Sequence, residues 1–138
     1  SQKGILKTTE IRKFTRNLLT KYDVRHSSLT QKAKELSGGN IQKLIVAREI
    51  EHGNKFLVAA EPTRGVDIVA MEFIHDKILE VRSKGGAVLL ISSELTEILS
   101  LSDRIYVMYG GNTNGEFTRE EATSEKLGLL MMGGKLNE

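Results

Sequence analysis

The 138-residue sequence contains no cysteine and few aromatic residues. The absence of cysteine excludes disulfides, thiol nucleophiles and thiolate metal sites, and it fits a reducing cytosol. Aromatic residues make up only 5% of the chain and do not alternate with clusters of lysine and arginine. The 20 basic residues exceed the 18 acidic ones by only two. Nucleic acid is therefore not expected as a partner.

Long apolar runs are also missing. The run AVLLI at 87–91 is among the longest, and it is far too short to span a bilayer. The N-terminus shows no charged-then-apolar signal pattern. Hydrophobic residues nevertheless make up 39% of the sequence, which suffices for the core of one domain of this length. We expect a soluble, cytosolic domain.

Hydrophobic periodicity predicts an alternation of helices and strands. Helices are expected over 8–22, 39–51, 68–84, 94–101 and 124–132. Short apolar runs predict strands over 55–60, 87–92 and 104–109, the first two buried on both faces. Asn114-Gly115 predicts the turn of a hairpin whose return strand ends near residue 118. The pattern indicates an α/β fold with a mainly parallel sheet flanked by helices.

Three short stretches could carry chemistry, and each has two interpretations. Ser37, Gly38 and Gly39 form either a plain turn that starts a helix or a set of backbone N–H groups that binds phosphate. Glu61, directly after a predicted strand, is either a surface carboxylate or a general base. Asp67 alone is a good helix N-cap. Spacing alone does not decide between these interpretations.

The order of the stretches favours the functional interpretation. LSGG at 36–39 opens a helix that ends just before an apolar strand. That strand ends in EPT at 61–63, followed by GVD at 65–67, a second helix, and a strand ending in SSE at 92–94. Four independent features in one order are much less expected by chance than any one of them.

With these motifs, nearly the whole chain resembles the ATP-binding subunits of ABC transporters. LSGGNIQKLIVAREI resembles the signature motif, FLVAAEPTRGVD the Walker B strand with the D-loop, and VLLISSELTEILSLSDRIYVMYGG the switch strand with the segment after it. EPTRGVD, ISSEL and LGLLMMGG are most like the second nucleotide-binding half of duplicated importers for simple sugars or nucleosides. The resemblance implies part of a P-loop NTPase domain, including part of its helical subdomain.

The resemblance implies a site for ATP and Mg²⁺ shared between two nucleotide-binding domains. One domain would hold the nucleotide, and the other would present its signature motif to the γ-phosphate. In this chain the signature residues would be Ser37, Gly38, Gly39 and Asn40, the last standing where glutamine is commoner. Glu61 would orient or deprotonate the attacking water, as the catalytic residue.

The remaining motif positions concern the D-loop and the switch. Gly65 and Asp67 would belong to the D-loop, which crosses the dimer interface. Ser93 takes the switch position, where histidine is common, and a serine does not titrate near neutral pH. Ala60 takes the usual Walker B aspartate position, and its methyl group cannot bind metal-bound water, so no metal ligand is expected here. The three histidines, His26, His52 and His75, do not replace these groups.

No G-x-x-x-x-G-K-[ST] sequence occurs in the 138 residues. The family's Walker A strand should therefore lie before residue 1, and we expect the chain to be the C-terminal part of a nucleotide-binding domain. Residues 1–52 would hold part of the helical subdomain and the signature helix. Residues 53–109 would hold the Walker B, D-loop and switch strands, and 110–138 a C-terminal hairpin and helix.

The implied partners are a second nucleotide-binding domain, transmembrane permease subunits and, indirectly, a solute-binding protein. This would place the protein at the inner face of the cell membrane. Apolar surface left uncovered in the isolated chain favours its self-association.

The sequence leaves three hypotheses open. The first is an ATPase subunit of an importer for simple sugars or nucleosides, with a degenerate half-site that hydrolyses ATP weakly or not at all. The second is a non-transport ABC-type ATPase, which the flanking sequences TRGVD and ISSEL disfavour. The third is an isolated α/β fragment that binds no nucleotide of its own. The sequence does not identify the solute.

Overall fold

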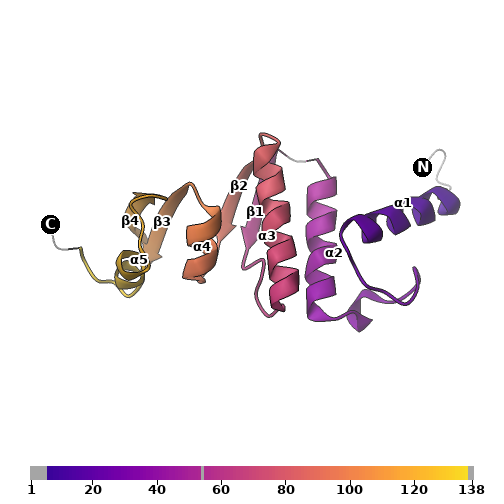
Figure 1. The fold of residues 1–138 in the computed structure, drawn as a ribbon, viewed down its shortest axis with the longest axis horizontal. Helices are drawn as coiled ribbons and strands as arrows, with labels where there is room; N and C mark the ends of the chain where they lie inside the picture. The colour runs from indigo at the N-terminus through magenta and orange to yellow at the C-terminus, as the bar shows by residue number, and fades with distance from the viewer. Residues whose placement is uncertain (1–5, 54, 137–138) are drawn as a thin grey trace. The chain divides into compact units, whose positions relative to one another are not determined.

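The structure is a computed structural model that describes residues 6–53 and 55–136. In chain order it contains α1 (Thr8–Lys21), the 3-10 helix η1 (Ala33–Glu35), α2 (Gly38–Glu51), β1 (Phe56–Ala60), α3 (Ile68–Ser83), β2 (Ala87–Ile91), α4 (Leu95–Leu101), β3 (Arg104–Tyr109), β4 (Asn112–Thr118) and α5 (Ser124–Met131) (Figure 1). The chain forms two compact units, Ser1–Leu57 with Pro62–Val88, and Val58–Glu61 with Leu89–Glu138.

In the first unit, α2 packs against both α1 and α3 (Figure 1). The buried core lies where α1 and the segment after it meet α2, and it consists of Leu19, Tyr22, Val24 and Ala47. Phe73 of α3 packs against this core, with its ring edge-on to that of Tyr22 at a centroid distance of 6.3 Å. Burial of apolar surface between these helices is therefore the main force that fixes α2 in place.

A buried lysine adds a polar connection to this apolar core. Lys43 lies on the inner side of α2, and its Nζ donates to Asp23 Oδ2 at 2.7 Å. The same Nζ lies 4.8 Å from the centroid of the Phe73 ring, so its charge also faces an aromatic surface. The hydrogen bond from Lys43 lowers the pKa of the Asp23 carboxyl group. The segment after α1 is thereby attached to the first half of α2.

Helix α3 connects two strands that pair with each other. Asp67 caps α3, because its Oδ1 accepts the Ala70 N–H at 2.9 Å, as predicted. Strands β1 and β2 are hydrogen-bonded neighbours. Ala87 N donates to Lys55 O, and Glu61 N donates to Ile91 O. The two strands therefore advance in the same direction, which confirms the predicted strand–helix–strand arrangement and the parallel pairing.

The two paired strands do not have both faces covered in this chain. Alternate side chains remain between 49% and 56% exposed, namely Phe56, Val58, Leu89 and Ile91. The prediction that both faces of these two strands are buried is therefore wrong within the residues that the structure describes. A continuous apolar run predicts cover on both faces of a strand, but the described residues cover only the intervening positions, and those only partly.

In the second unit, β3 and β4 form an antiparallel hairpin. Its turn is Gly110-Gly111, because Tyr109 pairs with Asn112 and the two glycines have φ of +55° and +80°. The prediction that Asn114-Gly115 forms the turn is wrong. These two residues lie within β4, beside a register shift between Val107 and Met108. Two consecutive glycines adopt positive φ without strain and so make the turn earlier in the sequence.

The side chain of Asn114 connects the hairpin to the C-terminal segment. Its Nδ2 donates to Leu130 O at 2.8 Å and to Gly134 O at 3.3 Å. Helix α5 packs on the hairpin, and the buried core of this unit consists of Ile105, Val107, Ala122, Leu127 and Leu130 (Figure 1). Among the residues that the structure describes, no helix is both long enough and apolar enough to cross a membrane.

Candidate functional site

The predicted signature residues lie at the N-terminal end of α2. Ser37 is the N-cap residue, with extended backbone angles, while Gly38 and Gly39 begin the helix. The Ser37 side chain does not cap the helix, and the first turn contains no acidic residue. The first N–H groups of a helix lack intrahelical partners and carry partial positive charge. The exposed end of α2 thus fits an anionic group such as phosphate.

Asn40, in the first turn of α2, makes two hydrogen bonds inside the first unit. Its Nδ2 donates to Ser37 Oγ at 2.8 Å, and its Oδ1 accepts the backbone N–H of Arg25 at 2.8 Å. Sequence patterns gave no indication of these bonds, because one partner is a backbone group 15 positions away. The buried position of Lys43 was also missed, since a lysine within a helix is normally assigned to the surface.

The signature glycines lie against the segment that was predicted to be the D-loop. A Cβ atom on Gly39 would lie 3.1 Å from Ala70 Cβ and 3.3 Å from Asp67 Oδ2. A Cβ atom on Gly38 would lie 3.6 Å from Gly65 O. The structure therefore brings the predicted signature and D-loop residues together within one unit, and glycine at position 39 permits the close approach.

Glu61 and Ser93 come together in the second unit. Glu61 directly follows β1, and its Oε1 accepts the backbone N–H of Ser93 at 3.0 Å. Its own N–H donates to Ile91 O at 2.7 Å, and its φ of +45° lies in the left-handed region, which is rare for residues other than glycine. Ser93 thus contacts the Glu61 carboxylate through its backbone N–H group, and the Ser93 side chain takes no part in this hydrogen bond.

The neighbouring positions offer little to a metal ion. Ala60 ends β1 and presents only a methyl group. Within 6–53 and 55–136 there is no group of three or more histidine, aspartate or glutamate side chains placed to hold a metal. The residues at this end of β1 therefore do not fit a Walker B metal site of the usual kind.

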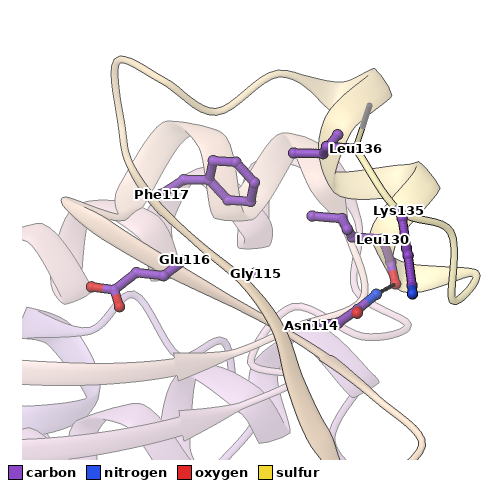
Figure 2. A pocket seen from close by; sticks show the side chains of 7 residues that line it. All are labelled: Asn114, Gly115, Glu116, Phe117, Leu130, Lys135 and Leu136. Atoms are coloured by element: carbon purple, nitrogen blue, oxygen red, sulfur yellow. Dashed lines mark hydrogen bonds between the residues drawn. The ribbon is translucent and has the colours of Figure 1, made fainter. Parts of the chain in front are cut away.

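A hollow of about 280 Å³ lies elsewhere in the second unit, beside the hairpin (Figure 2). It is lined by Asn114, Gly115, Glu116, Phe117, Leu130, Lys135 and Leu136. Figure 2 shows the Asn114 amide bonded to the Leu130 carbonyl group at its edge. None of the predicted site residues lines this hollow, and its one carboxylate and one amine belong to exposed residues, Glu116 and Lys135.

Comparison with known proteins identifies the family. No family model matches the sequence. The nucleoside import ATP-binding protein NupA of Lactococcus lactis subsp. cremoris is 44% identical over all 138 residues, which is 27% of its own length. The guanosine import ATP-binding protein NupO of Bacillus subtilis is 47% identical over 135 residues, covering 98% of this chain and 26% of that protein. The chain belongs to the ABC ATPase family.

Solved structures confirm that the chain has the ABC ATPase fold. The ADP conformation of the ATP-binding cassette MJ1267 aligns with a TM-score of 0.71 and 28% identity, over 96% of this chain and 54% of that one. The dimeric cassette MJ0796 bound to ADP and Pi aligns with a TM-score of 0.71 and 21% identity, over 85% of this chain and 50% of that one. The chain thus spans about half of these cassettes and about a quarter of the curated relatives.

Proposed function

We propose that the protein containing this ABC ATPase segment is the ATP-binding subunit of an importer for simple sugars or nucleosides. It couples the binding and hydrolysis of ATP to solute import, at the cytoplasmic face of the membrane and together with permease subunits. The observation that carries the proposal is the end-to-end similarity to import ATP-binding proteins, at 44% and 47% identity, across all of the motif positions.

The lengths of the matches support a protein with two cassettes. The aligned parts of this chain, 85–100% of it, correspond to 50–54% of a solved cassette but only 26–27% of a curated import protein. This ratio is expected if each import protein contains two cassettes in one chain. We assign the present segment to the C-terminal part of the second cassette, because of EPTRGVD, ISSEL and LGLLMMGG.

The role of this segment is to offer its signature residues to a nucleotide held by the partner cassette. The exposed, uncapped end of α2 supports this role, because its N–H groups and the Ser37 hydroxyl can donate to phosphate oxygens. The bound ATP supplies the phosphoryl group and brings its Mg²⁺. Closure of the two cassettes over the nucleotide then transmits the energy of binding to the permease.

The cassette half to which Glu61 belongs is proposed to be degenerate. Ala60 offers no oxygen to a metal-bound water, and Ser93 reaches Glu61 only through its backbone N–H. The hydrogen bond from Ser93 holds the Glu61 carboxylate in position. Ala60 and Ser93, however, supply neither a side-chain metal ligand nor an imidazole beside it. Hydrolysis in this half is therefore proposed to be slow or absent, while the composite site in the other half works.

Substitution of Glu61 in the assembled transporter tests this assignment. Glu61→Gln keeps an oxygen that accepts the Ser93 N–H, so the local structure should survive. We expect solute transport to fall less than twofold, whereas the same change at the catalytic glutamate of the partner cassette should abolish it. Equal and severe losses from the two substitutions, measured as transport into vesicles, would show that the half-site is catalytic.

The two other hypotheses are weaker. A non-transport ABC-type ATPase of DNA repair or translation would need a basic surface for nucleic acid, and the net charge of +2 on this chain argues against one. The third hypothesis, a fragment without nucleotide affinity, concerns only the isolated 138 residues. Because these residues contain no Walker A sequence, we expect them to bind ATP negligibly by themselves. That description is compatible with a signature motif that acts only on a partner's nucleotide.

A further inference from the structure

The orientation of the Asn40 amide follows from its partners. The backbone N–H of Arg25 can only donate, so the atom of Asn40 that faces it at 2.8 Å must be the oxygen. The other end of the amide, which faces Ser37 Oγ at 2.8 Å, is therefore the NH₂ group. The backbone of the segment after α1 thus fixes which end of the amide meets the serine.

This orientation determines the role of the Ser37 hydroxyl group. Because an NH₂ group can only donate, Ser37 Oγ must accept from Asn40, and its own hydrogen must point elsewhere. The side chain does not cap α2, and Ser37 is exposed at the end of the helix. The hydroxyl hydrogen is thereby left for an acceptor other than Asn40, and an anion at this exposed helix end would be one.

We infer that Asn40 is a positioning residue that turns the Ser37 hydroxyl so that its hydrogen is donated to the γ-phosphate of the partner's ATP. The inference rests on the proposed function, since it assumes that this end of α2 meets a phosphate. Phosphate oxygens only accept hydrogen bonds, so a serine whose hydrogen is directed outward binds them without first breaking another bond. Asn40 itself need not touch the nucleotide.

The rest of the first unit holds this arrangement in place. The segment carrying Arg25 is attached to α2 a second time, through the bond from Lys43 to Asp23 Oδ2, one turn beyond Asn40. Lys43 is buried, and Asp23 has a φ of +46°, so this attachment is defined by packing and by the backbone. The Arg25 N–H therefore has a fixed position relative to Asn40 before any nucleotide arrives, which lowers the cost of ordering the site on binding.

A double-mutant cycle in the full-length protein, assembled with its permease, tests the inference through kcat/KM for ATP. Ser37→Ala should lower kcat/KM about tenfold, because it removes a hydrogen bond to a charged group. Asn40→Ala should lower kcat/KM about fivefold when Ser37 is present. In the Ser37→Ala background, Asn40→Ala should change kcat/KM less than twofold, because its effect acts through the missing hydroxyl.

Asn40→Asp distinguishes positioning from a general structural role. One carboxylate oxygen can still accept the Arg25 N–H, but the other can no longer donate to Ser37 and instead accepts the hydroxyl hydrogen. We expect a larger loss of kcat/KM than for Asn40→Ala, with no decrease in the thermal midpoint, since an acidic residue near a helix N-terminus is stabilising. Part of this loss arises because the Ser37 hydroxyl now donates to Asp instead of to phosphate, and that part should vanish in the Ser37→Ala background. The part that arises from repulsion between the new carboxylate and the phosphate should remain.

The outcomes separate the inference from the proposed function. If Ser37→Ala lowers kcat/KM but Asn40→Ala costs the same factor in both backgrounds, Asn40 acts independently of the Ser37 hydroxyl, so the inference fails and the proposed function stands. If Asn40→Asp lowers the thermal midpoint and kcat/KM by the same amounts as Asn40→Ala, its role is structural and the inference fails as well. If Ser37→Ala leaves kcat/KM unchanged, the Ser37 hydroxyl does not bind phosphate and the inference fails, whereas the proposed function fails only if the assembled wild-type protein does not hydrolyse ATP.

Discussion

At the scale of single residues, the two glycines of the signature have different surroundings. A methyl group on Gly38 would meet only Gly65 O at 3.6 Å, which is an ordinary contact. A methyl group on Gly39 would approach Ala70 Cβ to 3.1 Å and Asp67 Oδ2 to 3.3 Å. Gly39 is therefore favoured by packing against α3, independently of any phosphate, whereas packing places no such constraint on Gly38.

This difference gives a prediction for stability. Replacement of glycine by alanine within a helix is stabilising by up to about 1 kcal/mol. We expect Gly38→Ala to raise the free energy of unfolding of the 138-residue chain, whereas Gly39→Ala should lower it by about 1 kcal/mol because of crowding against Ala70. Urea unfolding at low protein concentration measures both.

The matched control is Ala70→Gly, which removes the methyl group that Gly39→Ala would meet. The cost of Gly39→Ala should be smaller in this background, even though Ala70→Gly is itself destabilising. Equal costs of Gly39→Ala in the two backgrounds would show that the contact with Ala70 does not limit position 39.

At the scale of elements, helix α3 carries a carboxylate between two lysines. Glu80 accepts hydrogen bonds from Lys77 and Lys84, at three and four positions along the helix. These bonds lower the pKa of the Glu80 carboxyl group to about 2, from an ordinary value of 4.5. The last turns of α3 are thereby stabilised whenever the carboxylate is ionised.

The sign of this shift gives a prediction for pH dependence. A carboxyl group whose pKa is lower in the folded than in the unfolded state stabilises the fold fully at pH values above its pKa in the unfolded state. This contribution is lost as the pH falls through its pKa in the folded state. The free energy of unfolding should therefore be higher for the wild type than for Glu80→Gln above pH 4.5, and the two should converge between pH 4.5 and about 2. Urea unfolding as a function of pH measures the difference. A difference that stays constant down to pH 2 would contradict the assignment to Glu80.

The extent to which sequence predicted this structure differs between its elements. The helices over 8–22 and 39–51, and the strands on either side of the helix capped by Asp67, could be predicted because their apolar periodicity and capping residue are local signals. The hairpin turn could not, since Asn114-Gly115 and Gly110-Gly111 are both good turn sequences and the local sequence does not decide between them.

The candidate site was predictable in composition but not in its internal contacts. The order of motifs identified Ser37, Gly39, Asp67 and Glu61, and the structure brings Gly39 close to Asp67. The bond from the Arg25 backbone to Asn40 has no sequence signature, because any residue at position 25 except proline could provide the N–H group. The catalytic and binding roles of these residues remain predictions.

At the scale of the whole molecule, the described residues include an apolar surface on the paired strands that is only partly covered. Strands β1 and β2 carry a row of half-exposed apolar side chains on alternate positions, namely Phe56, Val58, Leu89 and Ile91. An apolar sheet surface of this kind favours association with another copy when no other segment covers it. In the intact protein, we propose that the rest of the cassette covers this surface.

We therefore predict that the isolated 138-residue chain self-associates through this surface. Its mass by light scattering should rise with protein concentration. The double substitution Val58→Thr, Leu89→Thr should shift this rise to higher concentration, because it makes two apolar positions on this surface polar. Phe14→Ser is the control, since Phe14 is exposed on α1 and lies on neither strand. A monomer at all concentrations, or an equal shift in the control, would contradict the prediction.

The bond between the Arg25 backbone and Asn40 has a consequence for protein engineering. A designer who transplants only residues 36–40 into another scaffold transfers the serine and the glycines but leaves behind the backbone group that orients the amide. In such a graft the amide is free to turn over, and the serine hydrogen loses its preferred direction. Both attachments to α2 lie within the continuous stretch from Asp23 to Lys43, so a graft needs at least that stretch to retain them.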